Sequence, residues 1–231
     1  MEEPLTILYT ANLGGSLERL PRMHTFLREL KNLPPADEPD VLLCAVEPVA
    51  RRILLLDAGD SCAPEVWHCA ATGGRSTLIV LDAMGYDAAN VSGILTAESR
   101  ARLDTNYLGM ALVDKSHPWQ SEGVMVICGD EKKSSSPATA PQREGRLRIV
   151  LSASQTQIVG EGLRTSPTGD VYLLPVAALQ VGVIHIAWEN HVPVIRAWTT
   201  LEMPPSTPPD PTISAAVEFV LAEARRYGTS G

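Results

Sequence analysis

The stretch Ile53-Leu54-Leu55-Leu56-Asp57-Ala58-Gly59-Asp60 decides the fold that we predict for this chain of 231 residues. Its first four residues form a continuous apolar run of strand length, which is typical of a strand covered on both faces in an α/β sheet. The run ends at a turn-forming Gly-Asp pair, and residues 76–84 then have the pattern of a helix. We therefore expect a central strand at 53–56, with Asp60 beyond its carboxyl end.

The flanking sequence supplies the other elements of an α/β arrangement. Apolar runs predict strands at 5–9 and 87–91, and apolar side chains at helical spacing predict a helix over 17–30. Thr96 has the residue type of an N-cap for a helix that begins near Glu98. The later predicted strands are 124–128 and 147–151, followed by a β-meander of 171–174, 182–188 and 192–199 with a tight turn at Glu189-Asn190-His191.

This order of elements favours one layered α/β domain that spans residues 1–231 over two smaller domains. Residues 131–146 are rich in Lys, Ser and Pro, and we expect a mobile loop there. Residues 203–211 hold five prolines and predict an extended linker to a C-terminal amphipathic helix at 212–227.

Charge and hydropathy exclude some classes of function and location. The net charge of −8 argues against non-specific binding to nucleic acid, which needs Lys and Arg to neutralise phosphates. No apolar stretch is long enough to span a bilayer. The first residues carry Glu2 and Glu3 where a secretory signal would carry bases, so we expect a cytoplasmic protein. Its four cysteines are then expected to be reduced thiols: Cys44, Cys62, Cys69 and Cys128.

Three segments together resemble the calcineurin-like metallophosphoesterases and, within them, the 5′-nucleotidase branch. Residues 7–15 look like the strand and loop that carry Asp-x-His-Gly in that branch, and residues 54–60 match its Leu-Asp-Ala-Gly-Asp motif. Residues 81–91 match the helix and strand before its Gly-Asn-His-Glu motif, and weaker matches at 149–158 and 171–199 follow in the same order. The resemblance implies an α/β/β/α sandwich of two mixed sheets.

The resemblance also implies a site where two metal ions would activate water against a phosphoester. The positions of the opening Asp and His hold Asn12 and Gly14, and the Asn of Asn-His-Glu corresponds to Gly93. Asp60 stands where the bridging Asp is expected, although a plain turn residue at a strand end is the favoured interpretation of it.

The late Gly-His-Thr-His motif of the family corresponds to a segment with Gln155 and Gln157 in place of its histidines. Asp60 is then the only retained ligand type, and neutral amides cannot balance two dications. We therefore expect no metal, no other cofactor and no catalytic residue. The vestigial site comprises Asn12, Gly14, Asp60, Gly93, Gln155 and Gln157.

Our preferred hypothesis is a catalytically inactive metallophosphoesterase-like domain that acts as a binding or assembly module for a protein partner that the sequence does not identify. One alternative is an active metal-dependent phosphohydrolase with a rearranged site. The other is a metal-free sensor of a small phosphorylated ligand.

Two further clusters have a chemical and a structural interpretation. Cys62, His68 and Cys69 with Asp60 could form a different metal site, but their spacing matches no standard zinc pattern and buried thiols are favoured. Residues 73–76 could hold an anion at a helix start, although a plain helix start is favoured. We expect structural roles for His24, His185 and His191.

Overall fold

The computed structural model describes residues 3–32, 52–104, 108–129, 146–152, 163–165 and 169–228. The predicted loop at 131–146, apart from its last residue, lies outside these ranges, as do Cys44, Gln155 and Gln157.

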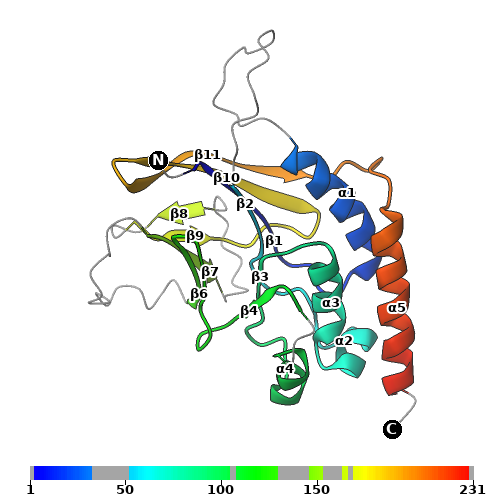
Figure 1. Ribbon diagram of the computed structural model, residues 1–231. Coiled ribbons are helices and arrows are strands. Elements are labelled where there is room, and N and C mark those ends of the chain that lie inside the picture. The colour runs from blue at the N-terminus through cyan, green and yellow to red at the C-terminus, as the bar shows by residue number, and fades with distance from the viewer. Residues whose placement is uncertain are drawn as a thin grey trace.

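Two mixed sheets stack face to face, with the helices grouped beside one of them (Figure 1). The six-stranded sheet has the order β11-β10-β1-β2-β3-β4. Strands β1 to β4 are parallel to one another, and β10 is antiparallel to both of its neighbours, β1 and β11. Its strands are β1 Leu5–Thr10, β2 Arg52–Asp57, β3 Ala88–Asn90, β4 Ala111–Val113, β10 Gln180–Glu189 and β11 Val192–Glu202.

The five-stranded sheet has the order β5-β6-β7-β9-β8, in which β6, β7 and β9 are parallel. The two mixed sheets predicted from the sequence are thereby confirmed, and β2 is the central strand expected at 53–56. The strands of this second sheet are β5 Trp119–Ser121, β6 Val124–Gly129, β7 Leu147–Ser152, β8 Leu163–Thr165 and β9 Val171–Leu173.

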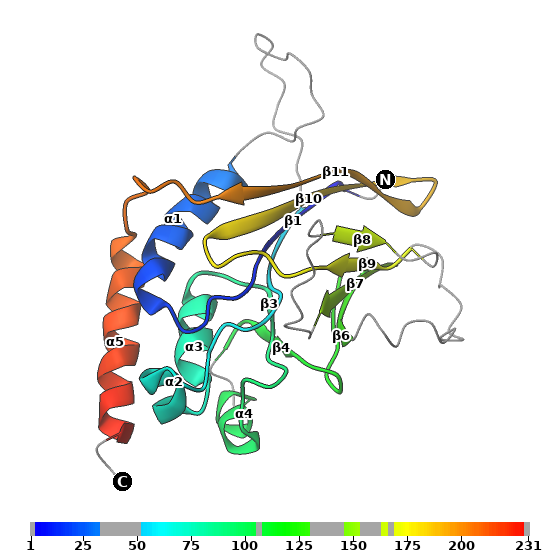
Figure 2. The same ribbon diagram turned by 180° about the vertical axis from the view of Figure 1, so that it is seen from behind.

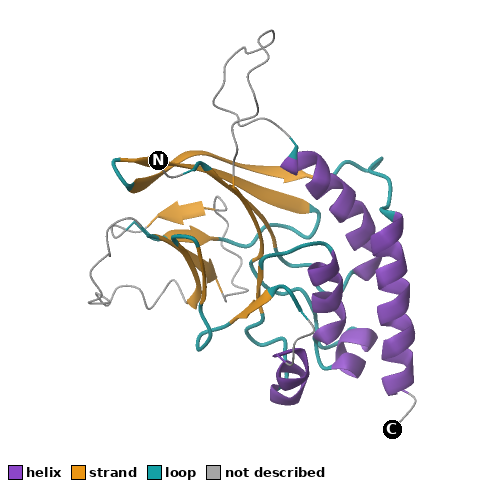
Figure 3. Ribbon diagram, in the orientation of Figure 1, coloured by secondary structure: helices purple, strands orange, loops and turns teal. Residues whose placement is uncertain are grey.

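The helices cover the face of the first sheet that is turned away from the second sheet (Figures 2 and 3). In the described ranges they form one layer, and no helix of those ranges covers the outer face of the second sheet. The helices are η1 Leu17–Arg19, α1 Leu20–Lys31, α2 Trp67–Thr72, α3 Arg75–Ala83, α4 Ala97–Asp104 and α5 Pro211–Gly228. None of the described helices is both long and apolar enough to cross a membrane.

Alternation along β1 and β2 divides the core into two parts. Leu8 and Leu55 point to the helices and pack in one buried cluster with residues of α1, α3 and α5. Ile7 and Leu54 point the other way and pack against residues of the second sheet such as Ile149. The first sheet is therefore buried on both faces at its centre, which is why β2 needs a continuous apolar run.

The predicted β-meander is wrong in one respect. β10 and β11 form a hairpin on the first sheet, closed by Asn190 and His191 with positive φ values of 51° and 67°, the geometry of a two-residue hairpin turn. β9 instead lies in the second sheet, parallel to β7. Val171 and Leu173 of β9 are buried in the core between the sheets, so burial decides the partner of β9 and nearness in sequence does not.

Candidate functional site

The loops after β1, β2 and β3 meet at one edge of the first sheet, because these strands are parallel and in register. Thr10 pairs with Asp57, and Asp57 pairs with Ala89. Asn12, Asp60 and Gly93 each follow a strand end by a few residues. The structure thus brings the loops of these sequence-predicted positions to a common edge, where ligand sites of open α/β sheets form.

The β1 and β2 loops continue the parallel ladder beyond their strands. Asn12 N donates to Gly59 O at 3.0 Å, Gly14 N donates to Asp60 O at 2.8 Å, and Gly15 N donates to Ser61 O at 2.8 Å. Asn12 and Asp60 have positive φ values of 55° and 58°, a conformation that Asn and Asp tolerate better than most residues. The two loops are therefore fixed to each other through their backbones.

The side chain of Asn12 has a structural partner. Its Nδ2 donates to the carbonyl oxygen of Val176 at 2.8 Å, in the connection between β9 and β10. This bond joins the loop after β1 to the segment that passes from one sheet to the other. The amide is therefore used as a hydrogen-bond donor, a role that an Asp carboxylate at this position would not perform.

Asn90, at the end of β3, joins the β2 and β3 loops through hydrogen bonds of its side chain. Its Nδ2 donates to Ala58 O at 2.9 Å, and its Oδ1 accepts from Ser92 N at 3.0 Å and from Cys128 Sγ at 3.1 Å. The side chain is buried, and a Cβ on Gly59 would lie only 3.0 Å from Asn90 Nδ2. Asn90 is not among the positions predicted from the sequence, although a polar residue at the carboxyl end of a predicted strand was a signal that could have identified it.

Asp57 is a fully buried carboxyl group under the same loops. Its Oδ2 accepts a hydrogen bond from Ser61 Oγ. Burial raises the pKa of Asp57 to about 7, the Ser61 hydroxyl opposes this rise, and the charge of Asp60 adds to it. Asp57 is therefore protonated in a large share of molecules near neutral pH.

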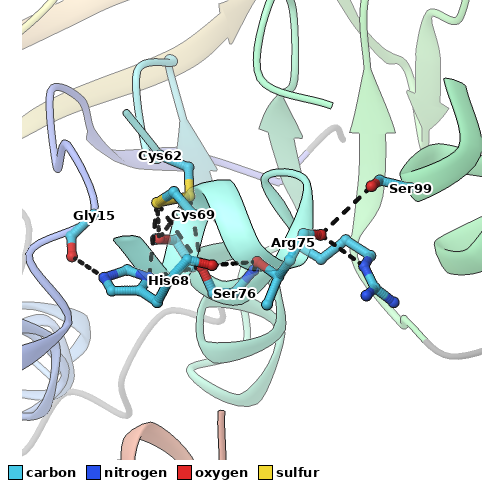
Figure 4. The surroundings of a disulfide bond; sticks show 9 residues. Gly15, Cys62, His68, Cys69, Arg75, Ser76 and Ser99 are labelled. Carbon is cyan, nitrogen blue, oxygen red and sulfur yellow. Dashed lines mark hydrogen bonds between the residues drawn. A yellow bond between two sulfur atoms is a disulfide. The ribbon is translucent and has the colours of Figure 1, made fainter. Parts of the chain in front are cut away.

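Cys62 and Cys69 form a disulfide, so the expectation that both are reduced thiols is wrong (Figure 4). The β2 loop and α2 bring their Cα atoms to 5.8 Å, within the range that a disulfide needs. Their separation of 7 positions in sequence gave no signal for this pairing, because α2 was not predicted. The cytoplasmic location, on which the thiol expectation depended, remains a prediction.

His68 lies between Gly15 and Ser76, next to the disulfide (Figure 4). Because the Gly15 carbonyl only accepts, His68 Nε2 donates to it at 2.9 Å, and Nδ1 accepts from Ser76 Oγ at 2.8 Å. Burial lowers the pKa of His68, which favours the neutral ring. Because both cysteines are used in the disulfide, the alternative metal site at Cys62, His68 and Cys69 has no thiolate ligands.

The other sequence candidates have internal partners. Thr96 Oγ1 accepts from Ser99 N at 3.1 Å, as the predicted N-cap of α4 should. Arg75 lies over the ring of Tyr227 at 5.3 Å and donates from Nε to Thr72 O at 2.9 Å, which agrees with a plain start of α3.

The described residues do not supply the ligand set of a two-metal centre. Of the sequence-predicted positions in the described ranges, Gly14 and Gly93 have no side chain and Asn12 is neutral, which leaves the carboxylate of Asp60. Across the part of the chain that the structure describes, no three or more His, Cys, Asp or Glu side chains are grouped so as to hold a metal ion. Two-metal chemistry needs several anionic and imidazole ligands around both ions, so these residues do not fit it.

No protein-family model matches the sequence, and no curated protein matches it. Among solved structures, the calcineurin-like phosphoesterase YfkN from Bacillus subtilis matches with a TM-score of 0.62 and 12% identity, over 98% of this chain and 99% of that chain. The chain has the calcineurin-like phosphoesterase fold. A hypothetical protein from Thermus thermophilus matches with a TM-score of 0.46 and 11% identity, over 86% of this chain and 100% of that chain. The predicted calcineurin-like fold is thereby confirmed by the first of these structures, and assignment to the 5′-nucleotidase branch remains a prediction.

Proposed function

We propose that this chain is a calcineurin-like phosphoesterase fold without two-metal catalysis, which serves as a binding or assembly module. The chemistry of the side chains at the three strand ends carries this proposal. The described positions offer one carboxylate, Asp60, together with one neutral amide and two glycines.

Charge supports the proposal. Two dications close together require several anionic ligands, and Asp60 supplies a single negative charge. Asp57 does not make up the difference, because it is fully buried, bonded to Ser61 and has a pKa raised to about 7 by burial. The amide nitrogen of Asn12 is occupied by Val176.

A binding role is supported by the rigidity of the edge and by the space above it. The β1 and β2 loops are bonded through their backbones, and Asn90 fixes the β3 loop to Ala58. A Cβ on Gly93 would meet no atom within 4 Å, and one on Gly14 would meet only Asn12 O at 4.0 Å. The two glycines therefore leave room on a fixed frame, as a preorganised binding surface requires.

Metal content and phosphatase activity of the full chain test the absence of catalysis. We expect substoichiometric metal after incubation with manganese and zinc followed by desalting, and no hydrolysis of nucleotides. Stoichiometric metal together with phosphatase activity that Asp60→Ala abolishes and Glu65→Gln keeps would overturn the proposal. Glu65 is the matched control because it is an exposed acid further along the same loop.

A thermal-shift screen and pull-down test the binding role. A ligand at 100 times its dissociation constant stabilises the folded state by about 2.7 kcal/mol, which a thermal shift detects easily. A shift that Gly93→Leu removes, because the added side chain fills the open space, would support a binding role at this edge. A partner or ligand whose affinity is the same for wild type, Gly93→Leu and Asp60→Ala would place binding elsewhere on the molecule.

A further inference from the structure

The disulfide lies directly beside the candidate site. Cys62 follows Asp60 by two positions on the β2 loop, and Cys69 lies in α2. The bond is therefore a covalent tie between α2 and the loop that carries Asp60. The disulfide therefore constrains the loop of Asp60, on which the proposed function depends.

The β1 loop rests on the same disulfide. A Cβ on Gly15 would lie 3.0 Å from Cys69 Sγ and 3.1 Å from Val66 Cγ1, so the Gly15 backbone is packed closely against the bond. Gly15 O accepts from His68 of α2, and Gly15 N donates to Ser61 O of the β2 loop. Through Gly15, the disulfide fixes the backbones of both loops.

Polar groups of α2 and α3 surround the two sulfur atoms. Ser76 Oγ lies 3.6 Å from Cys62 Sγ and 3.8 Å from Cys69 Sγ, and Thr77 Oγ1 lies 3.4 Å and 4.0 Å from them. His68 Nδ1 lies 3.7 Å from Cys69 Sγ. Hydroxyl groups can accept from a thiol or donate to a thiolate, so each reduced cysteine would have a hydrogen-bond partner on α3 once the covalent bond is broken.

We infer that the Cys62–Cys69 pair is a redox-controlled latch on the candidate site. In the disulfide form the latch holds the β1 and β2 loops in register. In the dithiol form the covalent tie between α2 and the β2 loop is gone, and the hydrogen bonds from Gly14 and Gly15 to the β2 loop open more easily. The consequence for ligand binding rests on the proposed function, whereas the effect on the loops does not.

The reaction that opens the latch is thiol–disulfide exchange with a dithiol reductant. Cys62 and Cys69 are buried, so exchange takes place when the β2 loop and α2 open locally. A thiolate of the reductant then attacks one sulfur, the Cys62–Cys69 bond breaks, and a mixed disulfide forms. The second thiol of the reductant then attacks its own sulfur in the mixed disulfide and releases the remaining cysteine as a thiol. Two electrons and two protons pass to Cys62 and Cys69, which become thiols, and the reductant leaves as a disulfide. Cys128 takes no part, because burial raises the pKa of its thiol to about 11 and Asn90 holds its sulfur.

Amide hydrogen exchange of the full chain before and after reduction with dithiothreitol tests the latch. Gly14 N and Gly15 N report the state of the loops, because they donate to Asp60 O and Ser61 O. We expect their exchange to accelerate at least about tenfold on reduction, as local opening becomes easier. Alkylation followed by mass spectrometry should show Cys62 and Cys69 linked before reduction and modified after it.

Two variants complete the test. Cys62→Ser should copy the reduced protein without any reductant, and Cys128→Ser should leave the exchange of both forms unchanged. If Cys62→Ser does not fold, the reduced wild type still gives the readout. Free thiols at Cys62 and Cys69 in air-oxidised protein, or equal exchange at Gly14 and Gly15 before and after reduction, would overturn the inference. Because exchange needs no ligand, this result is independent of the metal and phosphatase measurements.

Discussion

The loops at the carboxyl edge of the first sheet and the frame directly beneath them are built in opposite ways. On the loops, Gly14 and Gly93 have no side chain, and Gly93 faces open space. In the frame, Asp57 and Asn90 are buried polar residues with specific hydrogen-bond partners. The edge is therefore held by the buried residues of the frame and not by side chains at Gly14 and Gly93, so the chemistry at those two positions can change while the fold is kept.

The frame should respond to pH through Asp57. Its pKa in the folded state is about 7 against an ordinary value of 3.8, so folding binds a proton and the stability from this group is lost as pH rises from the ordinary pKa through the folded one. With 1.36 kcal/mol per pKa unit, the wild type should lose about 4 kcal/mol between pH 4 and pH 8 from this group.

Asp57→Asn should remove this loss, because a neutral amide has no charge to bury. Urea unfolding at pH 5, 6.5 and 8 measures the difference between the wild type and the variant, in which the contributions of other groups cancel. Glu65→Gln, an exposed acid of the same loop, should keep the wild-type dependence. Parallel stability curves for wild type and Asp57→Asn would contradict the assignment.

Asn90→Ala should destabilise the frame at the second of its two buried polar residues. The substitution removes the partners of Ala58 O and Ser92 N, and it leaves the Cys128 thiol with only the longer contact to Val113 O at 3.5 Å. Each buried group left without a partner costs about 1–3 kcal/mol. We expect a loss of about 3 kcal/mol in the free energy of unfolding, measured with urea. Cys128→Ser keeps a donor to Asn90 and should cost much less. A loss equal to that of Cys128→Ser would show that Asn90 is no brace.

Asn12→Asp tests a loop side chain that has a structural hydrogen bond, the bond from Asn12 Nδ2 to Val176 O. The substitution places a carboxylate oxygen against Val176 O, where Nδ2 now donates at 2.8 Å. Asp tolerates the positive φ as Asn does, so the effect isolates the lost donor, and we expect a loss of about 2 kcal/mol. Thermal unfolding with and without manganese measures it. Stabilisation of the variant alone by manganese would show that the substitution restores a metal ligand that Asn12 does not supply, whereas stabilisation of the wild type would count against the proposed function. An unchanged free energy of unfolding would contradict the role of Asn12 Nδ2 as donor to Val176 O.

Gly93→Asn should have the smallest effect. The position has a φ of 77°, which Asn adopts readily, and open space for a side chain, so we expect a change below about 0.5 kcal/mol. Gly74→Asn is the matched control: its φ is 87°, but its Cβ would lie 2.4 Å from Ile94 O. Chemical denaturation of both variants should separate them clearly. Similar losses would mean that the β3 loop at Gly93 is as constrained as the start of α3 at Gly74.

Much of the fold could be predicted from the sequence, because periodicity and turn residues are local signals. The strands expected at 5–9, 53–56 and 87–91 are β1, β2 and β3, and the helix expected at 17–30 corresponds to η1 and α1. Parallel order then placed Asn12, Asp60 and Gly93 at one edge. Residue types alone also showed that these positions carry one carboxylate.

The tertiary structure decided what depends on contacts between distant segments. It paired Cys62 with Cys69 through a helix that has no clear sequence pattern, and it placed β9 in the second sheet by burial. It also gave Asp57 and Asn90 their roles, because the pKa of a carboxyl group and the partners of an amide depend on the side chains that folding brings around them. The sequence by itself thus determined the main strands and helices and the chemistry of the loops, and the packing of the folded chain determined how those loops are held.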